Sequence, residues 1–172
     1  CAVCDHASPV APMNRKRVGI VGAGQLGRML ALAGYPLGID CRVLDRAADA
    51  PGAQVADAVL GALDDVDALG KLAASVDVLT LEIENVDVTA LESVGRKIAV
   101  YPPPRAVAAA QDRLSEKTLF RSLGIPTAAY VGVDSERDLA VAAVKRGWPI
   151  VLKTRRMGYD GRGQRIVDSA AQ

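Results

Sequence analysis

A glycine-rich hexapeptide near the start of the chain has the spacing of a phosphate-binding turn. Gly22-Ala23-Gly24-Gln25-Leu26-Gly27 fits G-x-G-x-x-G and follows an apolar run at residues 18–21. Glycines permit a tight turn, and the free backbone N–H groups at a helix start bind anions. Asp45 follows the glycine motif at close to the sequence spacing at which a carboxylate binds the ribose in dinucleotide-binding domains. By itself this motif favours an NAD-type dinucleotide, and the alternative is a tight turn that binds nothing.

Two carboxylates follow a second apolar run, at residues 78–81. Glu82 and Glu84 are two residues apart, so they lie on one face of an extended chain. Open α/β sheets bind their ligands at the carboxyl ends of parallel strands. We expect both side chains to accept hydrogen bonds from the amine and hydroxyl groups of a substrate. The alternative is a solvated strand end followed by a turn at Asn85.

Residues 153–165 concentrate positive charge, with five basic side chains and a single acidic one, Asp160. Gly158, Gly161 and Gly163 allow large changes of backbone angle, which suits a loop that covers phosphate groups. A solvated basic hairpin is the equally supported alternative. Arg113 lies in a predicted helix, where an arginine is ordinarily a surface charge paired within its own helix.

The elements that would position these groups alternate between strand and helix. Apolar runs predict strands at residues 18–21, 41–44, 58–60, 76–81 and 98–100. Helical patterns follow the glycine turn, where Met29, Leu30, Leu32 and Ala33 form an apolar face, and recur at residues 65–74 and 88–94. Such alternation predicts an α/β fold with a parallel, doubly wound sheet.

Tyr101-Pro102-Pro103-Pro104 ends this alternation, because prolines cannot donate to a strand ladder. We place a domain boundary there, which divides the chain into a leader expected to be disordered (1–13), a sheet domain (14–101) and a second unit (102–172). The second unit is predicted to contain a helix over residues 105–123, a strand at 128–133 and a helix over 135–145. A hairpin of residues 150–153 and 164–167 completes it.

The composition excludes several classes of protein. With 21 Lys plus Arg and 20 Asp plus Glu, the net charge of +1 lacks the basic field of a general nucleic-acid binder. We find no apolar run of bilayer length and no secretory leader, which favours a cytoplasmic protein without a membrane anchor. The 3 cysteines suggest no disulfide framework. Cys1, Cys4 and His6 lack the fourth ligand of a closed zinc site, so no metal ligand is assigned.

Four segments taken together resemble the amino-terminal part of the 5-(carboxyamino)imidazole ribonucleotide synthase family, the ATP-grasp ligases of purine biosynthesis. In chain order they are VGIVGAGQLGRMLALAGYPLG, LTLEIENV, AQDRLSEKTLF and VLKTRRMGYDGRGQ. The resemblance covers residues 18–167. It implies a Rossmann-like pre-ATP-grasp domain, a linker helix and the start of an ATP-grasp domain, the α+β lid subdomain. It also implies that the first sheet contributes to an aminoimidazole ribonucleotide site and binds no dinucleotide.

The resemblance implies ATP-dependent carboxylation of aminoimidazole ribonucleotide with bicarbonate, through carboxyphosphate. It assigns catalytic roles to Lys153 and Arg162. Substrate contacts would come from Gln25, Leu26, Glu84, Tyr159 and Asp160. ATP contacts would come from Arg113, Lys153, Gly158, Tyr159, Asp160, Gly161, Arg162, Gly163 and Gln164. A homodimer and Mg²⁺ on the ATP are also implied, with the Mg²⁺ ligands expected beyond this chain.

Two departures from the family pattern stand out. Met157 occupies a position where we expect glycine, which stiffens the loop. The family's metal-binding residues lie further along than Gln172, so we expect a truncated chain that does not turn over by itself. A formate- or ammonia-handling ATP-grasp ligase is the nearest alternative. An NAD(P)-binding module or dehydrogenase, and a non-catalytic remnant that binds nucleotide or a partner, are the others.

Overall fold

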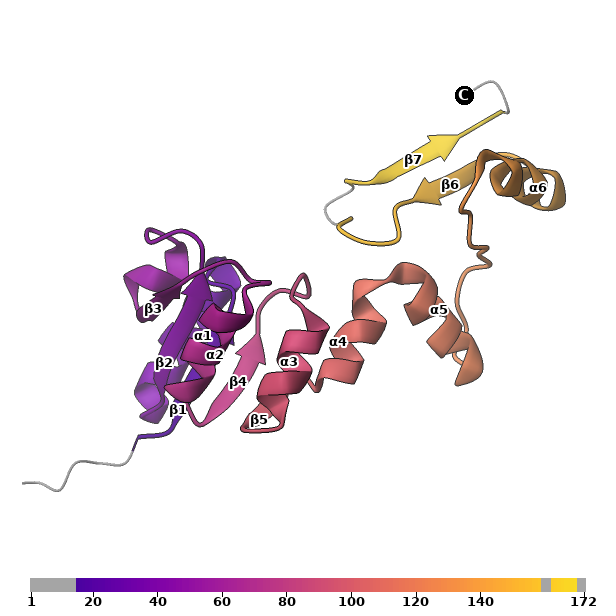
Figure 1. Cartoon of the computed structure of the whole chain (residues 1–172). Coiled ribbons are helices and arrows are strands. Elements are labelled where there is room, and N and C mark those ends of the chain that lie inside the picture. Colours follow the sequence, from indigo (N-terminus) through magenta and orange to yellow (C-terminus); the bar gives the residue numbers. More distant parts are fainter. Residues whose placement is uncertain (1–14, 159–161, 170–172) are drawn as a thin grey trace, which may run out of the picture.

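The computed structural model describes residues 15–158 and 162–169, and its first half is built on a parallel sheet (Figure 1). The strands are β1 (Arg17–Val21), β2 (Asp40–Asp45), β3 (Asp57–Leu60), β4 (Val78–Leu81) and β5 (Ala99–Tyr101). They lie in the order β3-β2-β1-β4-β5, and every neighbouring pair is parallel. The predicted sheet is therefore confirmed. From β1 the chain adds β2 and β3 on one side and then β4 and β5 on the other. The strand order therefore changes direction between β1 and β4, and the carboxyl ends of these two strands flank the position where such sheets bind ligands.

Helices cover both faces of this sheet. The helical segments are α1 (Gln25–Gly34), η1 (Tyr35–Leu37), η2 (Pro51–Gln54), α2 (Val66–Ala74) and α3 (Val88–Gly95). Successive strand residues point to opposite faces. Ile20 and Val43 accordingly pack in a core with Ala31 of α1, whereas Val21 and Leu44 pack in a second core with residues of α2 and α3. The alternation of the strands thus produces two apolar layers.

The buried face of α1 differs from the predicted one. The side chains expected to form its apolar face, Met29, Leu30, Leu32 and Ala33, are exposed, with Met29 62% accessible. The buried residues of this helix are Gly27, Ala31 and Gly34. A Cβ on Gly34 would lie 3.2 Å from Sγ of Cys41, so the helix packs too close to the sheet for large side chains. Close packing therefore selected the small residues of α1.

The second half contains α4 (Pro104–Gln111), α5 (Arg113–Ser122), α6 (Glu136–Arg146), β6 (Ile150–Lys153) and β7 (Gln164–Val167). Figure 1 shows α4 and α5 between the five-stranded sheet and the β6–β7 pair. The predicted antiparallel hairpin is confirmed, with Lys153 opposite Gln164. The predicted strand at 128–133 is wrong, because these residues pair with no strand in the described part of the chain.

The single helix predicted over residues 105–123 is also wrong. Asp112 has φ −122° and ψ 113°, an extended conformation that separates α4 from α5. Its carboxylate accepts hydrogen bonds from the backbone N–H groups of Leu114 and Ser115, at 2.9 and 3.1 Å. Asp is a favoured N-cap residue for this reason. Asp112 therefore ends one helix and begins the next.

Candidate functional site

The glycine turn closes around a carboxylate of the protein itself. The N–H groups of Gly24 and Gly27 donate to Oε1 and Oε2 of Glu82, at 3.1 and 3.2 Å. Glu82 follows β4, and β4 pairs directly with β1, so the sheet brings the two segments together. The anion at the start of α1 is thus an internal one.

Glycine is required in this turn because Glu82 leaves no space for a side chain. Gly22 has φ +98°, and a Cβ there would lie 2.5 Å from Cγ of Glu82. A Cβ on Gly24 would lie 2.8 Å from Oε1 of Glu82. Contacts of this length do not occur for real Cβ atoms. The G-x-G spacing that indicates close approach of a ligand here reflects close approach of Glu82.

Asp45, like Glu82, accepts hydrogen bonds from backbone N–H groups of the protein. Its Oδ2 accepts a hydrogen bond from the N–H of Ala23 at 3.0 Å, and its Oδ1 accepts one from Ala47 at 3.1 Å. The N–H groups of Ala23, Gly24 and Gly27, which were expected to hold a phosphate, thus already have acceptors within the protein. Each oxygen of Glu82 likewise accepts a hydrogen bond from the turn, and its expected contact with a substrate stays a prediction.

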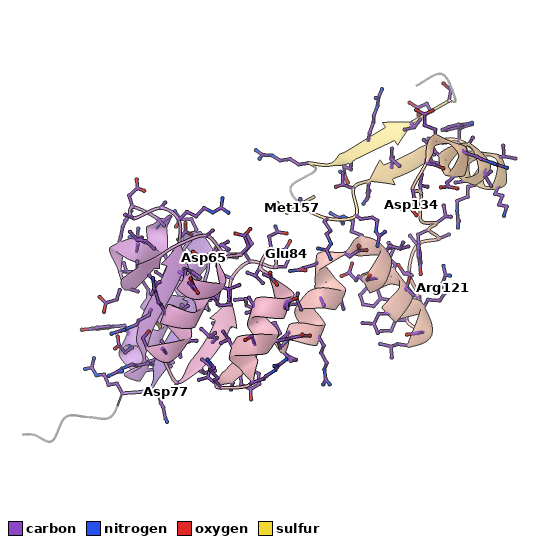
Figure 2. All side chains as sticks on the ribbon, in the orientation of Figure 1. Asp65, Asp77, Glu84, Arg121, Asp134 and Met157 are labelled. Atoms are coloured by element: carbon purple, nitrogen blue, oxygen red, sulfur yellow. The ribbon has the colours of Figure 1, made fainter. Side chains whose placement is uncertain are left out.

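Glu84 is exposed at the same edge of the sheet, and Figure 2 shows it between the sheet and α4. The side-chain amide of Gln111, at the end of α4, donates to the backbone carbonyls of Glu84 and Val86, at 2.5 and 2.7 Å. Nδ2 of Asn85 is buried without an acceptor among the described residues. Gln25 and Leu26 are exposed at the start of α1. The substrate role of these residues stays a prediction.

The basic loop forms a second group, which contacts the start of α5. A guanidinium N–H of Arg113 donates to the carbonyl of Gly158, and the N–H of Thr154 donates to the carbonyl of Gly163 at 2.7 Å. The first bond attaches the loop to the start of α5, and the second joins the two ends of the loop to each other. Lys153 lies at the end of β6, where its side chain is exposed.

Other predicted ATP contacts fall near the tip of this loop. Arg162, Gly163 and Gln164 are exposed, whereas Tyr159, Asp160 and Gly161 lie outside the described residues. Met157 has φ +62°, in the left-handed region that favours glycine. Glycine is thus the residue that the backbone at position 157 favours, as the family pattern suggested.

Sequence reasoning missed the junction between α4 and α5. Asp112 forms an ion pair with Arg155, at 2.7 Å between Oδ2 and Nη2, and the N–H of Arg113 donates to the carbonyl of Arg155 at 2.9 Å. An Asp within a helical pattern is a signal for an N-cap, which would have revealed the break. The pairing with Arg155, 43 residues later, has no signal in the sequence.

We also searched the described residues for metal-binding groups, cysteines and membrane-spanning helices. No group of three His, Cys, Asp or Glu side chains in residues 15–158 and 162–169 is arranged to hold a metal ion. Burial and the neighbouring Asp40 raise the pKa of the half-buried Cys41 thiol. Cys1, Cys4 and His6 lie outside the described residues. In that same part of the chain, no helix combines the length and hydrophobicity needed to cross a membrane.

Comparison with known families divides the chain in two. The family described as “Ribonucleotide synthetase preATP-grasp domain” matches residues 15–111. The family described as “ATP-grasp domain” matches residues 118–172. The first match covers the five-stranded sheet together with α4, and the second begins within α5.

Curated relatives match across both parts. An N5-carboxyaminoimidazole ribonucleotide synthase from Pseudomonas aeruginosa is 43% identical over 155 residues, which is 90% of this chain and 43% of that protein. One from Brucella melitensis is 45% identical over 148 residues, covering 86% of this chain and 41% of that protein. The chain therefore spans about two-fifths of the length of these relatives.

Solved structures agree in fold. N5-carboxyaminoimidazole synthetase from Staphylococcus aureus, complexed with ADP, has a TM-score of 0.88 and 34% identity, over 91% of this chain and 42% of that one. The enzyme from Aspergillus clavatus, in complex with ADP and 5-aminoimidazole ribonucleotide, has a TM-score of 0.81 and 34% identity, over 91% of this chain and 41% of that one.

Proposed function

Because this chain belongs to the ribonucleotide synthetase preATP-grasp family and continues into an ATP-grasp domain, we propose that it is part of a ligase that carboxylates 5-aminoimidazole ribonucleotide with bicarbonate and ATP. One observation carries the proposal. A solved relative that matches nearly the whole chain holds ADP and 5-aminoimidazole ribonucleotide. The two groups of exposed polar residues in this chain, at the sheet edge and at the basic loop, suit these two ligands.

The proposed reaction has two steps. An oxygen of bicarbonate attacks the γ-phosphorus of ATP, which forms carboxyphosphate and releases ADP. The exocyclic amine of the ribonucleotide then bonds to the carboxyl carbon, or to carbon dioxide released from carboxyphosphate. The bond from that carbon to the phosphate oxygen breaks, the amine loses a proton, and phosphate leaves. The product is the carboxyamino nucleotide.

The basic loop is proposed to serve the first step. Phosphoryl transfer is accelerated chiefly by cations placed beside the phosphate oxygens. Lys153 and Arg162 are exposed at the ends of the loop, and Arg113 faces it from α5. The remaining ATP contacts would come from the loop backbone and tip, namely Gly158, Tyr159, Asp160, Gly161, Gly163 and Gln164. Closure of such a loop would exclude the water that destroys carboxyphosphate.

The edge of the first sheet is proposed to hold the ribonucleotide. Glu84 is an exposed carboxylate beside the buried amide of Asn85, and Gln25 and Leu26 lie at the neighbouring helix start. A carboxylate and an amide can accept and donate hydrogen bonds to ribose hydroxyls and an amine. Tyr159 and Asp160 would reach the same substrate or bicarbonate from the loop.

Three further properties are proposed with this function. ATP would bind as its Mg²⁺ complex, since Mg²⁺ is usually held by phosphates and a few carboxylates. A homodimer is supported by exposed apolar side chains on α1 and η1, among them Met29, Tyr35 and Leu37. A cytoplasmic location is proposed as well, and the resemblance to purine-synthesis enzymes supports it.

The test is an ADP-formation assay on the protein expressed from its whole reading frame. ADP should form only when aminoimidazole ribonucleotide and bicarbonate are both present. Lys153→Met should lower kcat/KM about a hundredfold, as loss of one transition-state donor does. Lys71→Met, on the exposed side of α2, is the matched control. ADP formation that does not depend on the ribonucleotide would contradict the proposal.

A further inference from the structure

Two adjacent buried residues occupy the break between α4 and α5. Gln111 is 8% exposed and Asp112 is 6% exposed, and among the described residues these are the only buried side chains of polar or charged type. Buried polar groups are ordinarily bound to partners that need them. The partners of Gln111 and Asp112 lie on opposite sides of the break.

Gln111 binds toward the first sheet. Its amide nitrogen donates to the carbonyl oxygens of Glu84 and Val86, which flank Asn85. One side-chain amide therefore satisfies two backbone acceptors and determines the path of the segment after β4. Because Glu84 belongs to this segment, the position of its carboxylate depends on Gln111.

Asp112 binds toward the basic loop. Arg155 binds the carboxylate through two nitrogens, with Nη2 2.7 Å from Oδ2 and Nε 3.3 Å from Oδ1. A two-point arginine–carboxylate pair is directional as well as strong. Arg156 lies more distant, with Nε 3.9 Å from Oδ2. Arg155 is followed by the glycine-rich segment, so this pair holds the start of the loop.

The backbone reinforces the same contact. The N–H of Arg113 donates to the carbonyl of Arg155 at 2.9 Å, while the side chain of Arg113 donates to the carbonyl of Gly158. Arg113 is thus held between its neighbour Asp112 and the loop. A displacement of Arg155 would move both the loop and the guanidinium of Arg113.

We propose that Gln111 and Asp112 are positioning residues, which set the ribonucleotide side and the ATP side of the site independently. This inference rests on the proposed function. Gln111 holds the segment that carries Glu84, and Asp112 holds Arg113 and the base of the loop that follows Lys153. Neither side chain is expected to touch a substrate.

The electrostatics of Asp112 agree with such a role. Desolvation by burial opposes its ionisation, but hydrogen bonds from Arg155 and from the N–H groups of Ser115 and Leu114 outweigh it, so the pKa of Asp112 lies below its ordinary value. The carboxylate is therefore charged at neutral pH and retains its arginine partner.

The test is a crossed pair of substitutions in the protein expressed from its whole reading frame. Asp112→Asn keeps an N-cap of the same shape but removes the charge that binds Arg155. Gln111→Met keeps the volume but removes both hydrogen bonds. Calorimetry would measure the dissociation constants of ATP and of aminoimidazole ribonucleotide. Asp112→Asn should weaken ATP about tenfold and leave the ribonucleotide unchanged, and Gln111→Met should do the reverse.

Two further variants separate positioning from loss of folding. Arg155→Met breaks the same ion pair from the other side and should match Asp112→Asn. Asp134→Asn removes the other carboxylate near Arg155, which lies 3.9 Å away and is 80% exposed, and should behave as wild type (Asp134 is labelled in Figure 2). Substitutions that weaken both ligands equally, or neither, would overturn the inference.

A direct measurement on the 172-residue chain distinguishes failure of this inference from failure of the proposed function. Hydrogen exchange of the Arg113 and Thr154 amides should be faster in Asp112→Asn than in wild type, without any ligand. Unchanged exchange would overturn the role of Asp112 even if ATP binds. If exchange changes but wild type binds neither ligand, the proposed function fails and the role of Asp112 in holding the loop stands.

Discussion

Glu82 illustrates how an internal side chain can occupy a site that a motif assigns to a ligand. A helix start with free N–H groups attracts any nearby anion. In this chain the carboxylate of Glu82, from the adjacent strand, accepts the bonds from Gly24 and Gly27. The glycine turn thus binds an anion of the protein itself, whereas Glu84 is exposed at the same sheet edge, where we propose that it binds the ribonucleotide.

Glu82→Gln should therefore destabilise the first sheet. The amide retains one acceptor oxygen but presents an NH₂ group to one of the two turn N–H groups. One hydrogen bond is therefore lost, and two hydrogen-bond donors face each other in its place. We expect a loss of about 1–3 kcal/mol in the free energy of unfolding, measured with urea by circular dichroism.

Glu84→Gln is the matched control, because it makes the same chemical change two residues away on an exposed side chain. Its free energy of unfolding should stay within about 0.5 kcal/mol of wild type. Equal stability of the two variants would show that the turn does not depend on the charge of Glu82.

At the scale of elements, the loop of the β6–β7 hairpin holds one residue, Met157, in a backbone conformation that is unfavourable for its side chain. The ladder pairs Ile150 with Val167 and Lys153 with Gln164, and Thr154 bonds to Gly163 beyond it. Within the loop, Met157 adopts a left-handed conformation, which costs an L residue about 1–2 kcal/mol. Figure 2 shows Met157 in the loop that follows β6.

Met157→Gly should relieve this cost. Glycine adopts a positive φ freely, although it also gains freedom in the unfolded chain, so the net stabilisation should be about 0.5–1 kcal/mol. The only tryptophan, Trp148, precedes β6 and reports unfolding of this unit by fluorescence. Met157→Ala shortens the side chain but retains the cost of the positive φ. A gain from alanine as large as that from glycine would show that the side chain, and not φ, is responsible.

At the scale of the whole molecule, burial is unevenly distributed. The largest fully buried side chains, such as Leu69 and Leu79, lie in the first half of the chain. In the hairpin, Val151 and Ile166 are exposed. A two-stranded hairpin buries little apolar surface by itself. Its placement on α5 therefore depends strongly on the polar contacts of Asp112.

This dependence predicts a loss of stability in acid. The pKa of Asp112 is lower in the folded protein than in the unfolded chain. The resulting stabilisation is fully present above the unfolded carboxyl pKa of about 4 and disappears as the pH falls through the lower folded value. In residues 15–158 and 162–169, Arg155 and Arg156 pair with Asp112, and the one other acid that pairs with Arg155 is the exposed Asp134.

Urea unfolding followed by Trp148 fluorescence should thus show a falling midpoint below about pH 4. Asp112→Asn should be less stable than wild type at pH 7 and should lose less on acidification. An equal acid loss in both proteins would assign the effect to other carboxylates.

Local chemistry made much of this architecture predictable. The apolar runs and their spacing sufficed to predict the five parallel strands. In the central strand β1, burial on both faces demands continuous apolar residues, whereas the edge strands β3 and β5 are largely exposed. The hairpin was predictable from two short, largely β-branched runs separated by a glycine-rich segment. The apolar runs also placed Glu84 at the sheet edge and Lys153 at the end of a strand, where the structure has them.

Only the tertiary structure decided the remaining points. Helical periodicity misplaced the buried face of α1, because the distance between helix and sheet, and not hydrophobicity, selected Gly27, Ala31 and Gly34. The partners of Glu82 and Asp112 come from segments 55 and 43 residues away. A sequence determines which residues can form such bonds, since that follows from their chemistry. Which of them meet depends on strand order and helix packing, and these arise from the chain as a whole.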